Sequence, residues 1–364
     1  MIQAIMRMTV IVIYLLSVLP ASGQEVSLVE SVRPGQGLTL CGEAVPVEKP
    51  DVRERFEKEM LLSLGDRPQA LLWIKRAPRY LPLIEQTLKA NHMPEDLKYL
   101  AVAESALRPH AGSVKGAMGF WQLMPETARK YGLRVDEYVD ERRNIYLSTP
   151  AAVSYLQALY EHFSSWTLAL AAYNMGEEGL AAEMLEQGTE DYYDLYLPLE
   201  TQRFIFRVLA VKLILGDPAV YGFNVGAKDR YAPLIFDTVG VDCFEETPIR
   251  LVAEAAGTHF KAIKDLNPHL RGHYLQPGHL QINLPQGSVD GFNKRFRKLV
   301  STHRIDKQSR IYVIRSGDSL STIAERFEVP LAALLIWNRI GLNDPIHPGD
   351  RLVIFPGRSE QPTP

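Results

Sequence analysis

The sequence has few cysteines, no excess of either charge and no apolar run of membrane-spanning length. Its two cysteines, Cys41 and Cys243, exclude a disulfide-rich scaffold and lie too far apart for the spacing of a zinc knuckle. Lys and Arg total 40 against 43 for Asp and Glu, and the net charge of −3 argues against a dedicated nucleic-acid binder. The composition, 46% apolar and 23% charged, is typical of a globular chain, and 364 residues predict two or three domains.

The N-terminus departs from this composition. Residues 8–20 are apolar, and the small residues at 21–23 are of the kind that a signal peptidase reads. Because a spanning helix needs about 20 apolar residues, we predict a cleaved signal peptide over residues 1–23 rather than a retained anchor. Export implies an oxidising compartment, in which the two cysteines could pair; a disulfide and two free thiols both fit the sequence.

The first two thirds of the chain have the apolar periodicity of helices, in segments separated by Pro, Gly and Ser or Thr. This pattern predicts an N-terminal helical extension over residues 24–75 and a helical domain over residues 76–216. Thr149 and Pro150 are typical of the N-cap and the first residue of a helix, and Gly176 is typical of a helix end.

The last third contains an internal repeat. Residues 240–285, moved forward by 71 positions, align with residues 311–356 without a gap. Each copy has the pattern strand, helix, helix, strand, which predicts two small α+β modules over residues 236–286 and 311–356. The basic stretch 287–310 is predicted as a linker with a solvated helix face, the alternative being a binding patch, and residues 357–364 as a disordered tail. The identical pairs are Ala253/Ala324, Glu254/Glu325, Ala262/Ala333, Asn267/Asn338, Pro277/Pro348, Gly278/Gly349 and Pro285/Pro356, and the coinciding apolar pairs include Ile282/Val353 and Leu284/Phe355.

The second copy has specific turn motifs. Its first strand leads into the segment Arg315-Ser316-Gly317-Asp318-Ser319-Leu320, and Pro348-Gly349-Asp350 turns into its last strand. These features resemble the LysM family, which binds glycans that contain N-acetylglucosamine. The first copy has Glu246-Thr247-Pro248 in place of Gly317-Asp318-Ser319, which indicates a degenerate LysM-like module. The glycan contacts that the resemblance implies are Gly317, Asp318, Ser319, Leu320, Ile340, Gly341, Leu342 and Asn343.

Glu104 is the candidate catalytic residue. It follows Leu97, Leu100 and Ala101 at helical spacing, so its carboxyl group shares a face with apolar side chains. Pro109 discourages continuation of the helix, which places Glu104 near the helix C-terminus. Burial and the negative helix end both raise the pKa of a carboxyl group, so we expect Glu104 to hold a proton that it can donate. The apolar pattern alone also fits a structural glutamate with a buried partner.

Three short motifs surround this acid: Glu104-Ser105, Gly119-x-x-Gln122-x-x-Pro125 and Ala172-Tyr173-Asn174-x-Gly176. Together they resemble the catalytic domain of the soluble-type lytic transglycosylases, whose fold is all-α and similar to goose-type lysozyme. The resemblance implies that Glu104 acts first as catalytic acid and then as base. Trp121, inside the second motif, is predicted either to stack on a sugar or to belong to the core. The residues implied to line the substrate groove are Ser105, Gly119, Gln122, Tyr173 and Asn174.

The resemblance also implies the reaction. It is cleavage between N-acetylmuramic acid and N-acetylglucosamine of peptidoglycan with closure of a 1,6-anhydro ring, and it uses no metal or other cofactor. One acid suffices if the substrate supplies the nucleophiles, whereas glycosidases normally use two carboxylates. Glu126, Asp140 and Glu141 are predicted to cap helices or to pair with Arg142 or Arg143. Two alternatives stay open, a hydrolytic muramidase on the same fold and a non-catalytic peptidoglycan-binding scaffold, as does endo against exo cleavage.

The partners and location follow from the same resemblance. We expect a monomer that binds peptidoglycan glycan strands and no nucleic acid, in the periplasm or cell envelope of a Gram-negative bacterium. Peripheral association with the outer membrane stays open.

The sequence departs from the family at one position. Phe204 stands where the family has a tyrosine that is thought to approach the catalytic acid. Tyr193 and Tyr196 are the candidates to replace that hydroxyl group.

Overall fold

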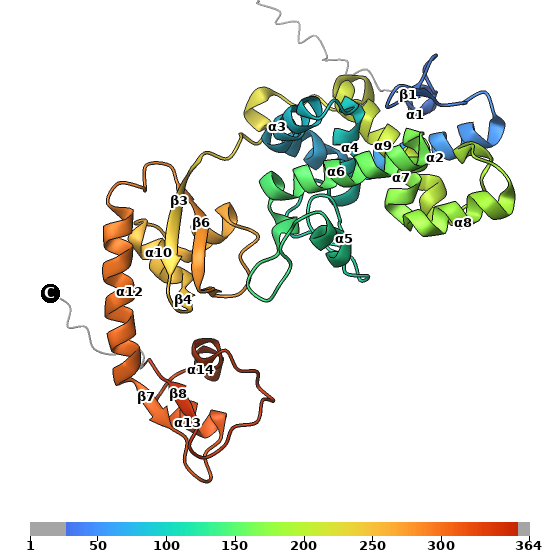
Figure 1. Ribbon diagram of the computed structural model, residues 1–364. Helices are drawn as coiled ribbons and strands as arrows, with labels where there is room; N and C mark the ends of the chain where they lie inside the picture. The colour runs from blue at the N-terminus through green and yellow to red at the C-terminus, as the bar shows by residue number, and fades with distance from the viewer. Residues whose placement is uncertain (1–26, 356–364) are drawn as a thin grey trace, which may run out of the picture.

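The computed structural model describes residues 27–355 as a helical domain followed by two small modules of helices and strands (Figure 1). The predicted signal peptide at residues 1–23 and the predicted tail at residues 357–364 lie outside the described residues. Within the described range, no helix is both long and apolar enough to cross a membrane.

The helical domain is built around α7, whose residues 166–172 are all buried. A helix that is buried all round needs neighbours on every side, and α6, α8 and α9 pack against it. The elements of this domain are α1 (Leu28–Val32), β1 (Thr39–Leu40), β2 (Glu43–Ala44), α2 (Pro50–Gly65), α3 (Arg67–Ala90), α4 (Lys98–Ser105), α5 (Pro125–Lys130), α6 (Ile145–Phe163), α7 (Trp166–Met175), α8 (Glu177–Gln187) and α9 (Leu199–Gly216).

Residues 27–75 share the core of this domain, so the predicted extension is part of it. The boundary expected between residues 75 and 76 falls inside α3, and α2 packs against α9. The β1–β2 hairpin also takes part, because the Glu43 carboxylate accepts hydrogen bonds from the backbone N–H groups of Trp166 and Thr167 at the start of α7. An acidic side chain at a helix N-terminus stabilises the helix, so the hairpin supports the central helix directly.

The helix start predicted at Thr149 and Pro150 is wrong. α6 begins directly after Asn144, whose side-chain oxygen accepts a hydrogen bond from the Tyr146 N–H group at 2.9 Å. Pro150 lies inside the helix, where it removes one backbone hydrogen bond near the N-terminus. Gly176 ends α7 as predicted, with a φ of 96° that favours glycine.

The first module contains the predicted strands and helices, and it is longer than predicted. β3 pairs antiparallel with β6, and β4 pairs with β5. Most of the predicted linker forms α12, whose Phe292 and Phe296 are buried in the core of the module while its basic side chains are mostly exposed. The elements are β3 (Phe236–Cys243), β4 (Thr247–Pro248), α10 (Ile249–Ala255), α11 (Phe260–Leu266), β5 (Tyr274–Leu275), β6 (Gly278–Pro285) and α12 (Phe292–Ser309).

The second module is smaller and has its own core, in which Ile323, Leu334 and Ile354 are almost fully buried. Its two strands pair antiparallel, Ile311 with Val353. The elements are β7 (Ile311–Val313), α13 (Leu320–Arg326), α14 (Leu331–Asn338) and β8 (Arg351–Val353).

An asparagine holds the second helix of each module to the last strand. The Asn267 side chain donates to the Ile263 carbonyl at 2.8 Å and exchanges two hydrogen bonds with the backbone of Asn283. Asn338 makes the same contacts with Leu334 and Val353. The repeat found in the sequence therefore corresponds to a repeated set of hydrogen bonds.

The same bonds show where the ungapped alignment of the repeat is wrong. The two asparagines are 71 positions apart, but their strand partners, residues 283 and 353, are 70 apart. The buried strand positions correspond as Ile282 with Leu352 and Leu284 with Ile354, not as the sequence comparison paired them. A shift of one residue exchanges the two faces of a strand, which a comparison of apolar residues alone did not detect.

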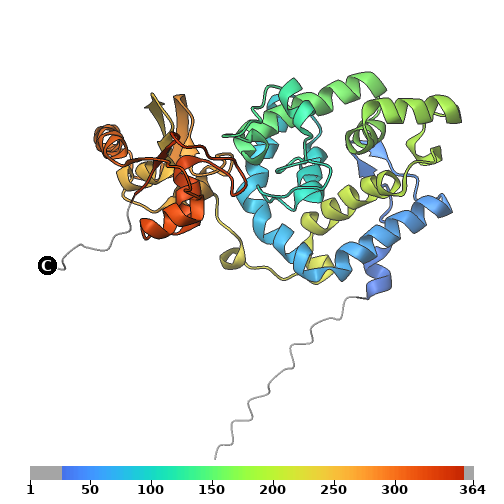
Figure 2. The same ribbon diagram turned by 90° about the horizontal axis from the view of Figure 1, so that it is seen from below.

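The first module docks on the loop between α5 and α6. Val139 of this loop is buried in the core of the module. The Asp140 N–H group donates to the His269 carbonyl at 2.8 Å, and the Arg271 N–H group donates to the Tyr138 carbonyl at 2.7 Å. Figures 1 and 2 both place the modules beside the helical domain, and this loop makes a backbone ladder with the first of them.

The second module reaches the same place through Arg339, at the end of α14. Its guanidinium group lies 4.6 Å from the centre of the Tyr138 ring and is paired with Glu137 and with Glu246 of the first module. The loop between α5 and α6 is therefore a meeting point of all three parts of the chain.

Cys41 and Cys243 are free thiols, so of the two alternatives the structure has the unpaired one. They lie in the helical domain and in β3 of the first module, and burial raises the pKa of both thiols.

Asn267→Ala is expected to destabilise the first module by about 2–4 kcal/mol, because it removes three hydrogen bonds of a buried side chain and leaves backbone groups of β6 without partners. Amide hydrogen exchange of α11 and β6 measures the effect. The control is Asn293→Ala on the exposed face of α12, which should change stability by less than about 0.5 kcal/mol. Equal exchange rates in the two variants would contradict the role of Asn267.

Candidate active site

Glu104 lies in the last turn of α4, as the sequence predicted. Leu100 and Ala101, on the same face, are fully buried, while the Glu104 side chain is partly exposed. Within the part of the chain that the structure describes, the Glu104 carboxyl group has no hydrogen-bond or ion-pair partner. The alternative of a structural glutamate with a buried partner is therefore not supported, because a buried carboxylate without a partner is destabilising.

Burial raises the pKa of Glu104 to about 8, from an ordinary value of 4.5. The positive charge of Arg207 lowers it, and the negative charge of Glu200 raises it. Both residues are on α9, where they pair with each other at 2.9 Å. The raised pKa confirms the expectation from the sequence, but Arg207 and Glu200 were missed, because only the packing of α9 against α4 brings them near the acid.

The end of α4 is fixed by hydrogen bonds. Ser105 is buried, and its hydroxyl group donates to the Ala101 carbonyl at 2.9 Å and accepts from the Leu107 N–H group at 3.1 Å. Ala106 and Leu107 both have positive φ, which reverses the chain directly after the catalytic candidate. Ser105 thus closes the helix end with a buried side chain, and its role in lining the groove stays a prediction.

Gly119 lies where two segments of backbone meet. It has a φ of +83°, and a Cβ atom there would lie 1.9 Å from the Arg142 carbonyl oxygen. Gln122 completes the loop, since its amide donates to the carbonyls of Ala111 and Gly119 at 2.9 and 2.8 Å. The glycine of the motif is therefore required for close packing, and the glutamine shapes the loop from within.

Arg142 supports this loop from outside it. Its guanidinium group donates to the carbonyls of Gly116 and Leu123 at 2.8 and 2.9 Å and pairs with Asp140 through two hydrogen bonds. Arg142 and Asp140 are both buried, and Arg143 also lies near the Asp140 carboxylate. The pairing of Asp140 with these arginines is as predicted, whereas the contact of Arg142 with the loop was not predicted.

Trp121 belongs to the core of the helical domain. Its ring is completely buried, and its indole N–H group donates to the Thr149 hydroxyl oxygen at 3.1 Å. Of the two predicted roles, the structure therefore supports the core. Thr149, which does not cap a helix, has this contact instead.

Tyr173 and Asn174, near the end of α7, make hydrogen bonds to the motif loop and to α9. The Tyr173 hydroxyl group donates to the Trp121 carbonyl at 2.6 Å, and Asn174 accepts a hydrogen bond from the Thr201 hydroxyl group at 2.9 Å. Burial raises the pKa of Tyr173, and the charge of Glu104 raises it further, which places the tyrosine within electrostatic range of the acid. Both side chains are partly exposed.

Among the described residues, neither candidate for the family tyrosine makes a hydrogen bond to Glu104. Phe204 is buried in α9; Tyr193 is buried with a hydroxyl group that has no partner within residues 27–355, and Tyr196 is 84% exposed. The charges that act on Tyr193 are those of Glu43, Asp191 and Arg55 and do not include Glu104.

The other acids near the motifs have separate roles. Glu141 accepts a hydrogen bond from the Arg134 N–H group at 2.7 Å, and Glu126 lies in the first turn of α5. An acid in that position stabilises the helix, in line with the predicted role of Glu126.

In the second module, several predicted glycan contacts face inward. Asp318 accepts hydrogen bonds from the Tyr312 hydroxyl group at 2.6 Å and from the Arg315 N–H group at 2.8 Å, and Leu320 is buried. Ser319 caps α13. The residues that stay available at the surface are Gly317, Ser319, Gly341, Leu342 and Asn343, with Ile340 partly buried.

Comparison with known families identifies two parts of the chain. Residues 82–195 match the family described as Transglycosylase SLT domain, and residues 312–355 match the LysM domain family. Glu104 and the three motifs lie in the part that matches the Transglycosylase SLT domain, and the second module is the part that matches the LysM domain.

The chain is similar to Membrane-bound lytic murein transglycosylase D of Escherichia coli K12, at 32% identity over 300 residues that cover 79% of this chain. The same protein from a second Escherichia coli strain matches equally. The chain spans 65% of the length of these curated relatives.

Two solved structures are similar to parts of the chain. The lytic transglycosylase Slt of Pseudomonas aeruginosa has a TM-score of 0.31 and 22% identity, over 42% of this chain and 26% of that one. The 70 kDa soluble lytic transglycosylase of Escherichia coli has a TM-score of 0.32 and 18% identity, over 49% of this chain and 33% of that one.

Gly119→Ala is expected to destabilise the helical domain by more than about 2 kcal/mol, because the new methyl group overlaps the Arg142 carbonyl and the backbone is left-handed there. The control is Gly116→Ala, at a φ of +94° with no atom near the added methyl group, which should lose only about 1 kcal/mol. Unfolding by urea measures both. Similar losses in the two variants would rule out the close contact.

The pKa of Glu104 predicts how stability depends on pH. The folded protein holds this proton up to about pH 8 and the unfolded chain only to about 4.5, so the contribution of Glu104 to stability falls as the pH rises between these values. Glu104→Gln removes the dependence. As the pH rises from 5 to 9, the free energy of unfolding of the variant should increase relative to that of the parent by on the order of 2–4 kcal/mol. This is less than the full pKa shift would give, because water reaches part of the Glu104 side chain. Parallel pH profiles in thermal unfolding would contradict this.

Proposed function

We propose that the chain is a peptidoglycan lytic transglycosylase that cleaves the β-1,4 bond between N-acetylmuramic acid and N-acetylglucosamine and forms a 1,6-anhydro-muramyl end. The observation that carries the proposal is the position of Glu104, a partly exposed acid in the last turn of α4 without a partner among the described residues, whose pKa burial raises to about 8. Such an acid is protonated at neutral pH and can donate its proton to a leaving oxygen. The transglycosylase SLT domain around it supports the same reaction.

The mechanism needs one acid in two states. Glu104 protonates the glycosidic oxygen, and the acetamide carbonyl of the muramyl residue stabilises the cationic centre. The carboxylate that results then accepts the proton of the C6 hydroxyl group, whose oxygen closes the anhydro ring, so that no water enters the product. Arg207 supports the second state, because its positive charge favours the carboxylate form of Glu104.

The residues of the motif loop contribute position rather than chemistry. Tyr173, within electrostatic range of Glu104, and Asn174, held by Thr201, are the polar groups proposed to contact the substrate, Asn174 at the acetamide. Gly119 and Gln122 keep the loop in shape. We propose in addition that the helical domain has a fold of the goose-type lysozyme kind.

The modules are proposed to hold the enzyme on its polymer. The LysM domain at residues 312–355 supports binding to glycan strands, and we propose that the first module is a diverged relative of it, given the shared asparagine bonds. The name of the curated relatives supports a location at the cell envelope. Export by a signal peptide and association with the outer membrane remain proposals.

Glu104→Gln is expected to lower the rate of release of soluble fragments from peptidoglycan by about 10²–10⁴-fold, because the acid and base are lost together. The parent rate should fall as the pH rises through about 8, where the acid loses its proton. Mass spectrometry of the parent's products should find ends that are one water lighter than reducing ends.

Glu126→Gln, at an exposed acid in the first turn of α5, is the matched control and should keep its activity. Reducing ends in the products would instead identify a hydrolytic muramidase. Binding to peptidoglycan without release of fragments would identify a non-catalytic scaffold.

A further inference from the structure

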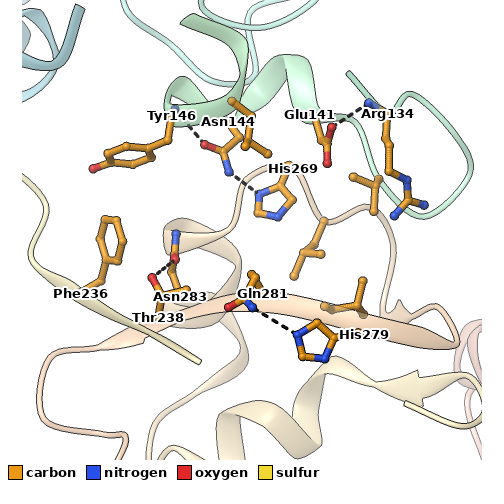
Figure 3. A pocket seen from close by; sticks show the side chains of 14 residues that line it. Arg134, Glu141, Asn144, Tyr146, Phe236, Thr238, His269, His279, Gln281 and Asn283 are labelled. Carbon is orange, nitrogen blue, oxygen red and sulfur yellow. Dashed lines mark hydrogen bonds between the residues drawn. The ribbon is translucent and has the colours of Figure 1, made fainter. Parts of the chain in front are cut away.

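A cavity of about 550 Å³ lies where the helical domain meets the first module. Its size is within the range of about 300–1,000 Å³ that is typical of small-molecule sites. Figure 3 shows side chains converging on it from two sides. Glu141, Asn144 and Tyr146 come from the helical domain, and Thr238 and Gln281 come from the paired strands β3 and β6. Neither Glu104 nor the groove residues Tyr173 and Asn174 line it.

The positive charge in the cavity is already paired. The Arg134 guanidinium group is bound to Asp136 at 2.6 Å and to Gln276 at 2.7 Å, and the Glu141 carboxylate accepts a hydrogen bond from the Arg134 backbone N–H group at 2.7 Å. The side chain of His279 is paired with Asp242 at 2.8 Å. The cavity thus lacks the free positive charge that a phosphate would need and favours a neutral polar ligand.

His269 presents a hydrogen-bond donor to the cavity. It is 8% exposed, and burial lowers its pKa to about 4, so the ring is neutral at neutral pH. Its Nδ1 atom accepts from the Asn144 amide at 3.3 Å, which leaves the proton of a neutral ring on Nε2. Figure 3 shows the ring between the two walls with this second nitrogen turned to the cavity, and no partner for it is present within residues 27–355.

Apolar surface lies beside these polar groups. The rings of Tyr146 and Phe236 meet edge to face at 5.4 Å, one from each side of the cavity, and Leu147 and Leu280 line the walls. Thr238 and Gln281 are exposed. The Thr238 hydroxyl group donates to the Asn283 side-chain oxygen at 2.9 Å and the Gln281 amide nitrogen contacts His279 at 3.2 Å, which leaves the Thr238 oxygen and the Gln281 carbonyl oxygen as acceptors for a ligand. Acetamido sugars combine apolar ring faces and a methyl group with amide and hydroxyl groups, and this lining matches both kinds of surface.

We propose that this cavity is a carbohydrate site that binds an N-acetylated amino sugar of a glycan chain, separate from the groove at Glu104 and from the LysM domain. The proposal goes beyond the proposed function, since it uses neither Glu104 nor the cleavage reaction. The site exists only while the first module is docked, because its two walls belong to different domains. A glycan bound there would therefore hold the module against the helical domain.

Hydrogen exchange with mass spectrometry tests the proposal on the full chain carrying Glu104→Gln, with the tetramer of N-acetylglucosamine as the ligand. The tetramer should slow exchange at residues 141–147 and 278–285, and these segments are resolved from those of the groove and of residues 312–355. Gln281→Ala and Thr238→Val should each raise the concentration needed for this effect by roughly threefold to tenfold, the value of one hydrogen bond. Asn293→Ala, an amide deletion on the exposed face of α12, is the matched control and should change nothing.

Unchanged exchange at both segments, with slowing confined to the groove or to residues 312–355, would overturn the proposal, as would equal effects of Gln281→Ala and Asn293→Ala. Circular dichroism of the variants shows whether they are folded; both substituted side chains are at the surface. The outcome is separate from that of the proposed function. The cavity can bind the tetramer in a chain that releases no anhydro products, and anhydro products can form in a chain whose cavity stays empty.

Discussion

The buried guanidinium group of Arg142 is the contact on which the geometry of the site depends. It neutralises Asp140, and it binds the two carbonyls that bracket the loop between Gly116 and Leu123. The backbone carbonyl oxygen of Arg142 occupies the space where a Cβ atom of residue 119 would lie. The backbone of the loop also bonds to itself, with the Met118 N–H group donating to the Leu123 carbonyl at 3.2 Å and the Gly119 N–H group donating to the Ala111 carbonyl at 2.8 Å. The Arg142 side chain thus adds two bonds to carbonyls at the two ends of the loop and ties them to the buried Asp140.

The same short stretch of chain also carries the docking of the first module. Val139 is in the core of that module, and the neighbouring Asp140 donates its N–H group to His269. A displacement of the module would therefore act on the residues next to Arg142, and so on the loop beside the catalytic candidate. Packed interfaces of this kind transmit displacement because they do not deform continuously.

The sequence predicted those features that depend on local pattern. Helical spacing placed Glu104 beside buried Leu100 and Ala101, and the repeat located both modules. The sequence did not predict features that depend on contacts between distant segments. Arg207 comes near Glu104 only because α9 packs on α4. The Trp121 indole is held in the core by a hydrogen bond to Thr149, 28 positions further along the chain. The shift of one residue between β8 and its counterpart β6 was missed because both faces of β8 carry apolar residues, so that two different alignments pair apolar residues equally well.

The basic helix α12 changes how the two modules act on a polymer. A flexible linker lets a second module search a volume, and its benefit falls gradually with length. α12 has 18 residues and is about 27 Å long. Phe292 in its first turn is buried in the core of the first module, so the second module is attached to the first by a rigid helix and not by a flexible linker. A rigid helix sets a fixed spacing between the two modules. Under the proposed function, the two modules would bind one glycan strand together only where that strand presents sugars at matching positions, so binding would depend on the spacing of accessible sugars as well as on their chemistry.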